Sequence, residues 1–124
     1  MLKTGILIGS FFSLMTIVLG AFGAHALKDQ LNEYGKSIYE KAVLYQMFHS
    51  IAIFVVAILN QFLDSTNLIL IVWIFVAGII LFSGSLYMLA ITQIKWLGAI
   101  TPIGGMLFIV GWIFLLYKTF NSNI

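Results

Sequence analysis

Hydrophobic residues fill four long stretches of the chain, and short polar segments separate them. The stretches cover roughly residues 5–26, 38–62, 68–92 and 98–117. Each is close to the length of about 20 mainly apolar residues that a helix needs to cross a bilayer. The pattern therefore predicts an all-α integral membrane protein, with residues 1–124 forming one domain of four transmembrane helices in an antiparallel bundle.

Composition supports membrane lipid as the surroundings of this chain. Hydrophobic residues make up 62% of it and charged residues 8%, whereas soluble proteins average about 45–50% and about 25%. A water-facing shell would need many more ionic side chains than these. The composition excludes a water-soluble globular domain.

Charge and cysteine content exclude further classes. There is no cysteine, so disulfides, thiolate metal sites and thiol chemistry are absent. The net charge is only +2, and the sequence contains no run of basic residues that could bind the phosphate backbone of a nucleic acid. We expect no nucleic-acid partner.

Local signals predict where the helices begin and end. Gly35 can end an amphipathic extension of the first helix past Ala26, and Ser37 with Glu40 fits a capping box that starts the second. Residues 60–67 read as a short polar turn between the second and third helices.

The single proline, Pro102, leaves two readings of the fourth helix open. In the first, which we favour, Thr101 caps a shortened helix with Pro102 at its first position. In the second, Pro102 kinks a longer helix.

The first stretch also has a competing interpretation. Lys3, the apolar run and the small residues around His25 resemble a secretory signal peptide, and cleavage after Ala26 would leave three spans. Small residues here also suit close helix packing, and we favour a retained span.

Lysine placement predicts the orientation of the chain. The first and third connections carry more lysines than the opposite side, which holds Lys3, Lys118 and the amino terminus. Those on the connections are Lys28, Lys36, Lys41 and Lys95. The positive-inside rule then places both termini outside the cytoplasm.

His49 is the polar residue in most need of explanation. It follows Ile38 by eleven residues, which is about 16 Å along a helix and near the middle of a membrane. Gln46 lies one turn earlier, and Tyr45 and Lys41 form a second row, so we expect this face to turn into the bundle.

Two readings of His49 and Gln46 remain open. In one, they form hydrogen bonds across helices, to partners such as Ser83, Ser85 or Thr101, and only stabilise packing. In the other, they line a polar pocket where His49 binds or protonates a ligand.

His25 lies near the end of the first helix, where we expect it to bond to a carboxylate such as Glu33 or Glu40. Haem ligation by both histidines is disfavoured, because His25 and His49 differ in depth by about 13 Å along the helices. We expect no cofactor, metal or catalytic residue.

Small residues recur on three of the stretches, where they would let helix backbones approach closely. Glycines of this kind could also leave room for a ligand or allow rocking, as in transporters. The candidate packing positions are Gly20, Gly23, Ala24, Gly84, Gly104 and Gly105.

Four strings together carry a family resemblance: LGAFGAHAL at 19–27, YQMFH at 45–49, LFSGSLY at 81–87 and ITPIGG at 100–105. In this order they closely resemble the small integral membrane proteins of the domain of unknown function 423 family. The resemblance implies a four-helix protein of the bacterial cytoplasmic membrane. It transfers no reaction, ligand or catalytic residue.

The sequence therefore favours a non-enzymatic structural, accessory or membrane-stabilising component. Its expected partners are membrane lipid and either a second copy or another membrane protein. The alternative is a small transporter or a binder of a lipophilic ligand, a lipid or a quinone, built around His49, Gln46 and Tyr45.

Overall fold

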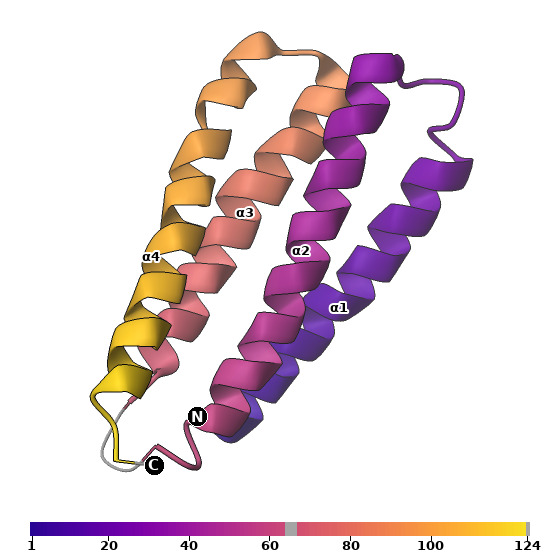
Figure 1. Cartoon of the computed structure of the whole chain (residues 1–124). Helices are drawn as coiled ribbons and strands as arrows, with labels where there is room; N and C mark the ends of the chain where they lie inside the picture. Colours follow the sequence, from indigo (N-terminus) through magenta and orange to yellow (C-terminus); the bar gives the residue numbers. More distant parts are fainter. Residues whose placement is uncertain (64–66, 124) are drawn as a thin grey trace.

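The computed structural model describes residues 1–63 and 67–123, and its long helices run antiparallel in sequence order (Figure 1). They are α1 (Leu2–His25), α2 (Glu33–Leu59), α3 (Ile69–Thr92) and α4 (Thr101–Phe120), with a short 3-10 helix, η1 (Lys95–Ala99), before α4. Four spans, the last including η1, are long and apolar enough to cross a membrane. This confirms the predicted all-α membrane architecture.

Each helix packs chiefly against its neighbour in the sequence: α1 on α2, α2 on α3, and α3 on α4. Consequently α2 and α3 lie in the middle, with 44% of the most apolar part of each buried. The corresponding shares are only 17% for α1 and 22% for the last span. The outer helices therefore have most of their surface exposed on the outside of the bundle.

The start of α2 differs from the prediction, because the helix begins at Glu33 and not near Ser37. Asn32 is the N-cap, and its side-chain oxygen accepts a hydrogen bond from the Gly35 amide at 2.6 Å. Asparagine caps as well as serine does, and the earlier start gains a further turn. Gly35 lies inside this turn with no positive φ, so it does not end the first helix.

The predicted extension of the first helix is also wrong. α1 ends at His25, and the segment that follows forms turns. Leu27 and Leu31 are buried there against Ile38 and Leu86, among other residues. The apolar residues of this segment therefore fold back into the core, where burial stabilises them more than an exposed helix along the headgroups would.

The shortened fourth helix is confirmed, with one change at its cap. α4 begins at Thr101 with Pro102 in its first turn, but Ile100 is the N-cap. The Thr101 hydroxyl instead lies 2.6 Å from the Ser85 hydroxyl of α3. Here a bond between helices replaces the capping bond.

The polar turn between α2 and α3 is held by asparagines on both sides of residues 64–66, which lie outside the described part of the chain. The Asn60 side chain accepts a hydrogen bond from the Leu68 amide at 2.8 Å. The Asn67 side chain accepts one from the Ile69 amide at 3.0 Å. Both satisfy amides that the start of α3 leaves free.

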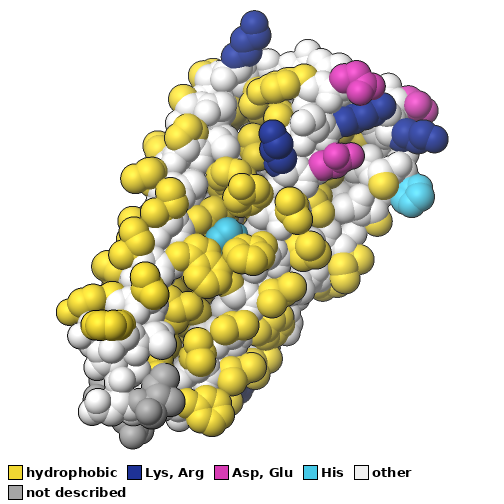
Figure 2. All heavy atoms as spheres, viewed as in Figure 1, with side chains coloured by type: hydrophobic (Ala, Val, Ile, Leu, Met, Phe, Trp, Pro, Cys, Tyr) yellow, Lys and Arg dark blue, Asp and Glu magenta, His cyan; other side chains and the backbone are white. Residues whose placement is uncertain are grey.

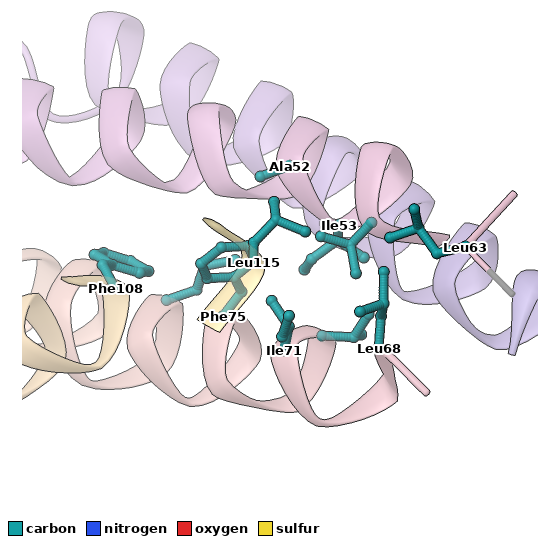
Figure 3. Packing of buried hydrophobic residues seen from close by; sticks show 11 residues of the cluster. Ala52, Ile53, Leu63, Leu68, Ile71, Phe75, Phe108 and Leu115 are labelled. Carbon is teal, nitrogen blue, oxygen red and sulfur yellow. The ribbon is translucent and has the colours of Figure 1, made fainter. Parts of the chain in front are cut away.

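The core consists of two apolar clusters with a polar layer between them. One cluster lies toward the α2–α3 turn, and Figure 3 shows residues of α2, α3 and α4 meeting there, among them Ile53, Phe75 and Phe108. The other lies toward the α1–α2 connection, around Tyr39 and Tyr87. The buried polar side chains of this layer are Thr16, Gln46, His49, Ser50, Ser83 and Ser85.

Close approach of α3 and α4 depends on Gly104. A Cβ at this position would collide with the backbone of Phe82, whereas a Cβ at Gly84 would meet nothing within 4 Å. We expect Gly104→Ala to lower the unfolding free energy in detergent by about 1–3 kcal/mol, as overpacking does.

Gly84→Ala is the matched control, because both substitutions gain the same helix propensity. Thermal unfolding followed by circular dichroism measures both. Equal midpoints for the two variants would contradict the close approach at Gly104.

Candidate functional site

His49 lies in the polar layer, 3% exposed, on the face of α2 that turns toward α3 and α4. Its ring stacks on Phe108 of α4 with centroids 3.5 Å apart and planes at 7°. Trp112 donates its indole N–H to His49 Nε2 at 3.1 Å, and His49 Nδ1 lies 2.8 Å from the Tyr45 carbonyl oxygen. The imidazole ring therefore has a stacking contact on one face and a hydrogen bond at each nitrogen.

These contacts assign the protonation of the ring. An indole N–H can only donate, so Nε2 of His49 must accept, and Nδ1 must then carry the proton that it donates to the Tyr45 carbonyl. His49 is therefore neutral in this arrangement. A proton or a metal at Nε2 would have to displace Trp112.

Gln46 joins three helices. Its side-chain N–H donates to the Phe12 carbonyl of α1 at 3.1 Å, and its side-chain oxygen accepts from the Tyr87 hydroxyl of α3 at 2.8 Å. Gln46 and His49 both face the interior, as the helical spacing predicts. The predicted partners are wrong, however, because Ser83 donates to the Ala42 carbonyl and Ser85 bonds to Thr101.

The second predicted row does not face the interior. Tyr45 is 41% exposed, and Lys41 is exposed as well. Successive residues of a helix point about 100° apart, so burying Gln46 turns its neighbour Tyr45 to the edge of the bundle. The Tyr45 ring rests there on Phe82, with centroids 4.5 Å apart.

His25 is exposed at the end of α1, and no hydrogen bond or ion pair to Glu33 or Glu40 is found in the described part of the chain. The expected carboxylate partner is therefore wrong. The two histidines are not brought together, and the described residues hold no group of three or more His, Cys, Asp or Glu that could bind a metal.

A groove between α2 and α4 runs beside His49 with a volume of about 460 Å³. We call it the α2–α4 groove; its lining residues are Tyr45, Phe48, His49, Phe82, Pro102, Gly105, Met106, Phe108, Ile109 and Trp112. Its walls are largely aromatic. The sequence predicts His49 and Tyr45 as site residues and Gly105 as a packing position. It does not single out Phe108 and Trp112, which are ordinary residues of a membrane span until α4 is placed beside α2.

A second cavity, which we call the α1–α2 slot, has a volume of about 280 Å³. It is lined by Gly20, Gly23, Ala24, Leu31, Lys36, Tyr39, Glu40, Val43, Leu44 and Met47. Of the predicted packing positions here, only Gly23 is tightly placed, because a Cβ would collide with the Tyr39 ring. A Cβ at Gly20 would make only an ordinary contact with Val43, at 3.5 Å.

No catalytic pairing is evident among the described residues. The hydroxyls of Ser50 and Ser83 donate to backbone carbonyls, and neither bonds to His49. No buried side-chain nitrogen or oxygen lacks a partner within the part of the chain that is described. The buried polar groups are therefore occupied by one another and by the backbone.

Comparison with known proteins places this architecture in a family. The chain is 46% identical to a UPF0382 membrane protein of Staphylococcus aureus (strain bovine RF122), over 97% of this chain and 98% of the relative. A UPF0382 membrane protein of Staphylococcus haemolyticus is 44% identical over the same shares. No solved structure matches the chain. Because a family model described as "Protein of unknown function (DUF423)" also matches residues 19–105, the chain belongs to the DUF423 family of membrane proteins, as its motifs indicate.

Proposed function

We propose that the protein is a non-enzymatic accessory or stabilising component of the bacterial cytoplasmic membrane. The observation that supports this role is the polar layer, in which every buried side-chain nitrogen and oxygen of the described residues has a partner. A group that is already bonded inside the protein is not directed at a substrate. These groups hold the helices in register instead.

The bonds of the polar layer connect every neighbouring pair of helices. Lipid offers no hydrophobic drive between helices, so interhelical hydrogen bonds and close packing determine how they associate. The bonds are Gln46 to Phe12 between α1 and α2, Tyr87 to Gln46 and Ser83 to Ala42 between α2 and α3, Ser85 to Thr101 between α3 and α4, and Trp112 to His49 between α4 and α2.

The surfaces left for interaction lie on the outer helices. The lipid-facing side of α1 is lined by large exposed residues such as Leu7, Phe11 and Ile17. A component of this kind acts through such a surface, on lipid or on a membrane partner, and needs no reaction centre.

Replacement of His49 tests whether it serves packing. His49→Leu removes the acceptor of Trp112 and the ring stacked on Phe108. We expect a lower thermal midpoint in detergent, and a double-mutant cycle with Trp112→Phe should give a coupling of about 0.6 kcal/mol, the average for such membrane bonds. Met47→Leu, on the exposed side of α2, is the control.

The same variants test the proposed role in cells. The variants are expressed in a bacterium that lacks its own copy, and its growth is measured under membrane stress. With His49→Leu, growth should fall only in proportion to the fall in the amount of folded protein. A His49→Leu protein with unchanged stability and amount that no longer restores growth would show a chemical role and contradict the proposal.

We place both termini outside the cytoplasm. Figure 1 shows the two ends of the chain at the same end of the bundle, and Figure 2 shows the charged side chains gathered mainly at the opposite end. The lysines at that opposite end favour the cytoplasm.

Alkaline phosphatase fused after residue 124 should therefore be active. Green fluorescent protein fused at the same position should be dark, because it would be exported in an unfolded form. The reverse pair of results would invert the proposed orientation.

The α2–α4 groove supports a second candidate, a binder of a lipophilic ligand. Its aromatic walls suit a flat ring, and the Tyr45 hydroxyl beside it has no hydrogen-bond partner in the described part of the chain. A ring that bears a carbonyl, as a quinone does, would stack on the walls and accept that hydroxyl's proton in a hydrogen bond.

Fluorescence of Trp112 tests this candidate in a variant with Trp73→Phe and Trp96→Phe. A naphthoquinone with a short isoprenoid tail should quench the remaining tryptophan saturably. Tyr45→Phe should weaken binding about fivefold, equivalent to one hydrogen bond of about 1 kcal/mol. Gly105→Leu, which fills the groove, should abolish it. Quenching that stays linear and equal in all variants would exclude this candidate.

A further inference from the structure

The α1–α2 slot changes from charged to apolar along its length. Lys36 and Glu40 lie one helical turn apart on α2 and line one end of the slot, and Val43, Leu44 and Met47 continue the same wall. From Glu40 to Met47 is about 10 Å along the helix axis. The charged end lies toward the start of α2, and the apolar part extends toward the middle of the membrane.

This order is that of a phospholipid in one leaflet, with its headgroup outside and its acyl chain inside. The facing wall on α1 consists of Gly20, Gly23 and Ala24. Gly23 lies against the Tyr39 ring, so the slot is open beside Gly20 and Ala24. The walls are therefore apolar where an acyl chain would lie and charged where the lipid headgroup would lie.

Lys36 and Glu40, at the charged end of the slot, have opposite charges, and among the described residues they do not form an ion pair with each other. A lysine ammonium can bind a phosphate, and a carboxylate can accept hydrogen bonds from an ammonium group. One cation and one anion at the same end of the slot are complementary to a headgroup that carries both charges.

We propose that the α1–α2 slot binds one phospholipid with a primary ammonium headgroup, of the phosphatidylethanolamine type. Lys36 pairs with its phosphate, Glu40 accepts hydrogen bonds from its ammonium, and one acyl chain lies along Val43 and Met47. Phosphatidylglycerol would leave Glu40 facing an anionic lipid without a cation. Phosphatidylcholine has no N–H to donate to Glu40.

Lipid retention by the purified full-length protein tests this site. The protein is extracted from vesicles that contain equal amounts of phosphatidylethanolamine, phosphatidylglycerol and phosphatidylcholine, and the retained lipids are counted by native mass spectrometry. We expect one retained lipid per chain, enriched in phosphatidylethanolamine over both competitors.

The variants separate headgroup recognition from general lipid binding. Glu40→Gln should lower the enrichment over phosphatidylcholine, and Lys36→Gln should lower retention of the phospholipid about fivefold, as loss of one cation near a lipid headgroup does. Gly20→Leu should block the slot with both charges intact. Glu33→Gln is the control, because Glu33 lies at the same end of the molecule outside the slot.

Equal retention of the three lipids, or enrichment that survives both Glu40→Gln and Gly20→Leu, would overturn the proposal. Circular dichroism of each variant shows whether it is folded, and the substituted residues are not part of the polar layer. The site goes beyond the proposed function, because an unsubstituted protein that restores growth but retains the three lipids equally would contradict this site alone.

Discussion

A polar group inside a bilayer has no water to bond to, so its partner must come from the protein. Gln46 shows how much structure follows from this constraint. Its amide bonds to a backbone carbonyl of α1 and its oxygen to a tyrosine of α3, so one side chain ties three helices together. If α2 rotated by one residue, both bonds would be lost. The register of the central helices is thus coupled to the satisfaction of a few polar atoms.

The same constraint separates the structural polar groups from those free to bind a ligand. His49 lies at membrane depth, yet Trp112, the Tyr45 carbonyl and Phe108 occupy its nitrogens and one face. The hydroxyl of Tyr45 and the charges of Lys36 and Glu40 are not occupied in this way, and each lines a cavity. These three groups, which line the two cavities without an internal partner among the described residues, are the ones to which binding is assigned in the proposals.

Prediction of the spans and of the inward placement of Gln46 and His49 succeeded because each depends on a local property. Twenty apolar residues cross a membrane whatever surrounds them, and residues three apart, such as Gln46 and His49, share a helix face in any fold. Prediction failed at Ser37 and at the segment after Ala26, where two physically adequate solutions existed. At Ser37 a second local solution, the Asn32 cap with its bond to the Gly35 amide, was the one adopted. After Ala26, the burial of Leu27 and Leu31 prevailed through contacts with other helices.

The amino-acid sequence by itself determined that this protein lies in a membrane and has four membrane-spanning helices, because both follow from hydropathy and helix length. It also determined the family, which the motifs indicate. Only the tertiary structure decided which helix supplies each partner. The rotation and pairing of α4 put Trp112 on His49, and the one-sided packing of α1 left the slot open. Such choices depend on the fit between faces that lie far apart in the chain, and no local pattern records that fit.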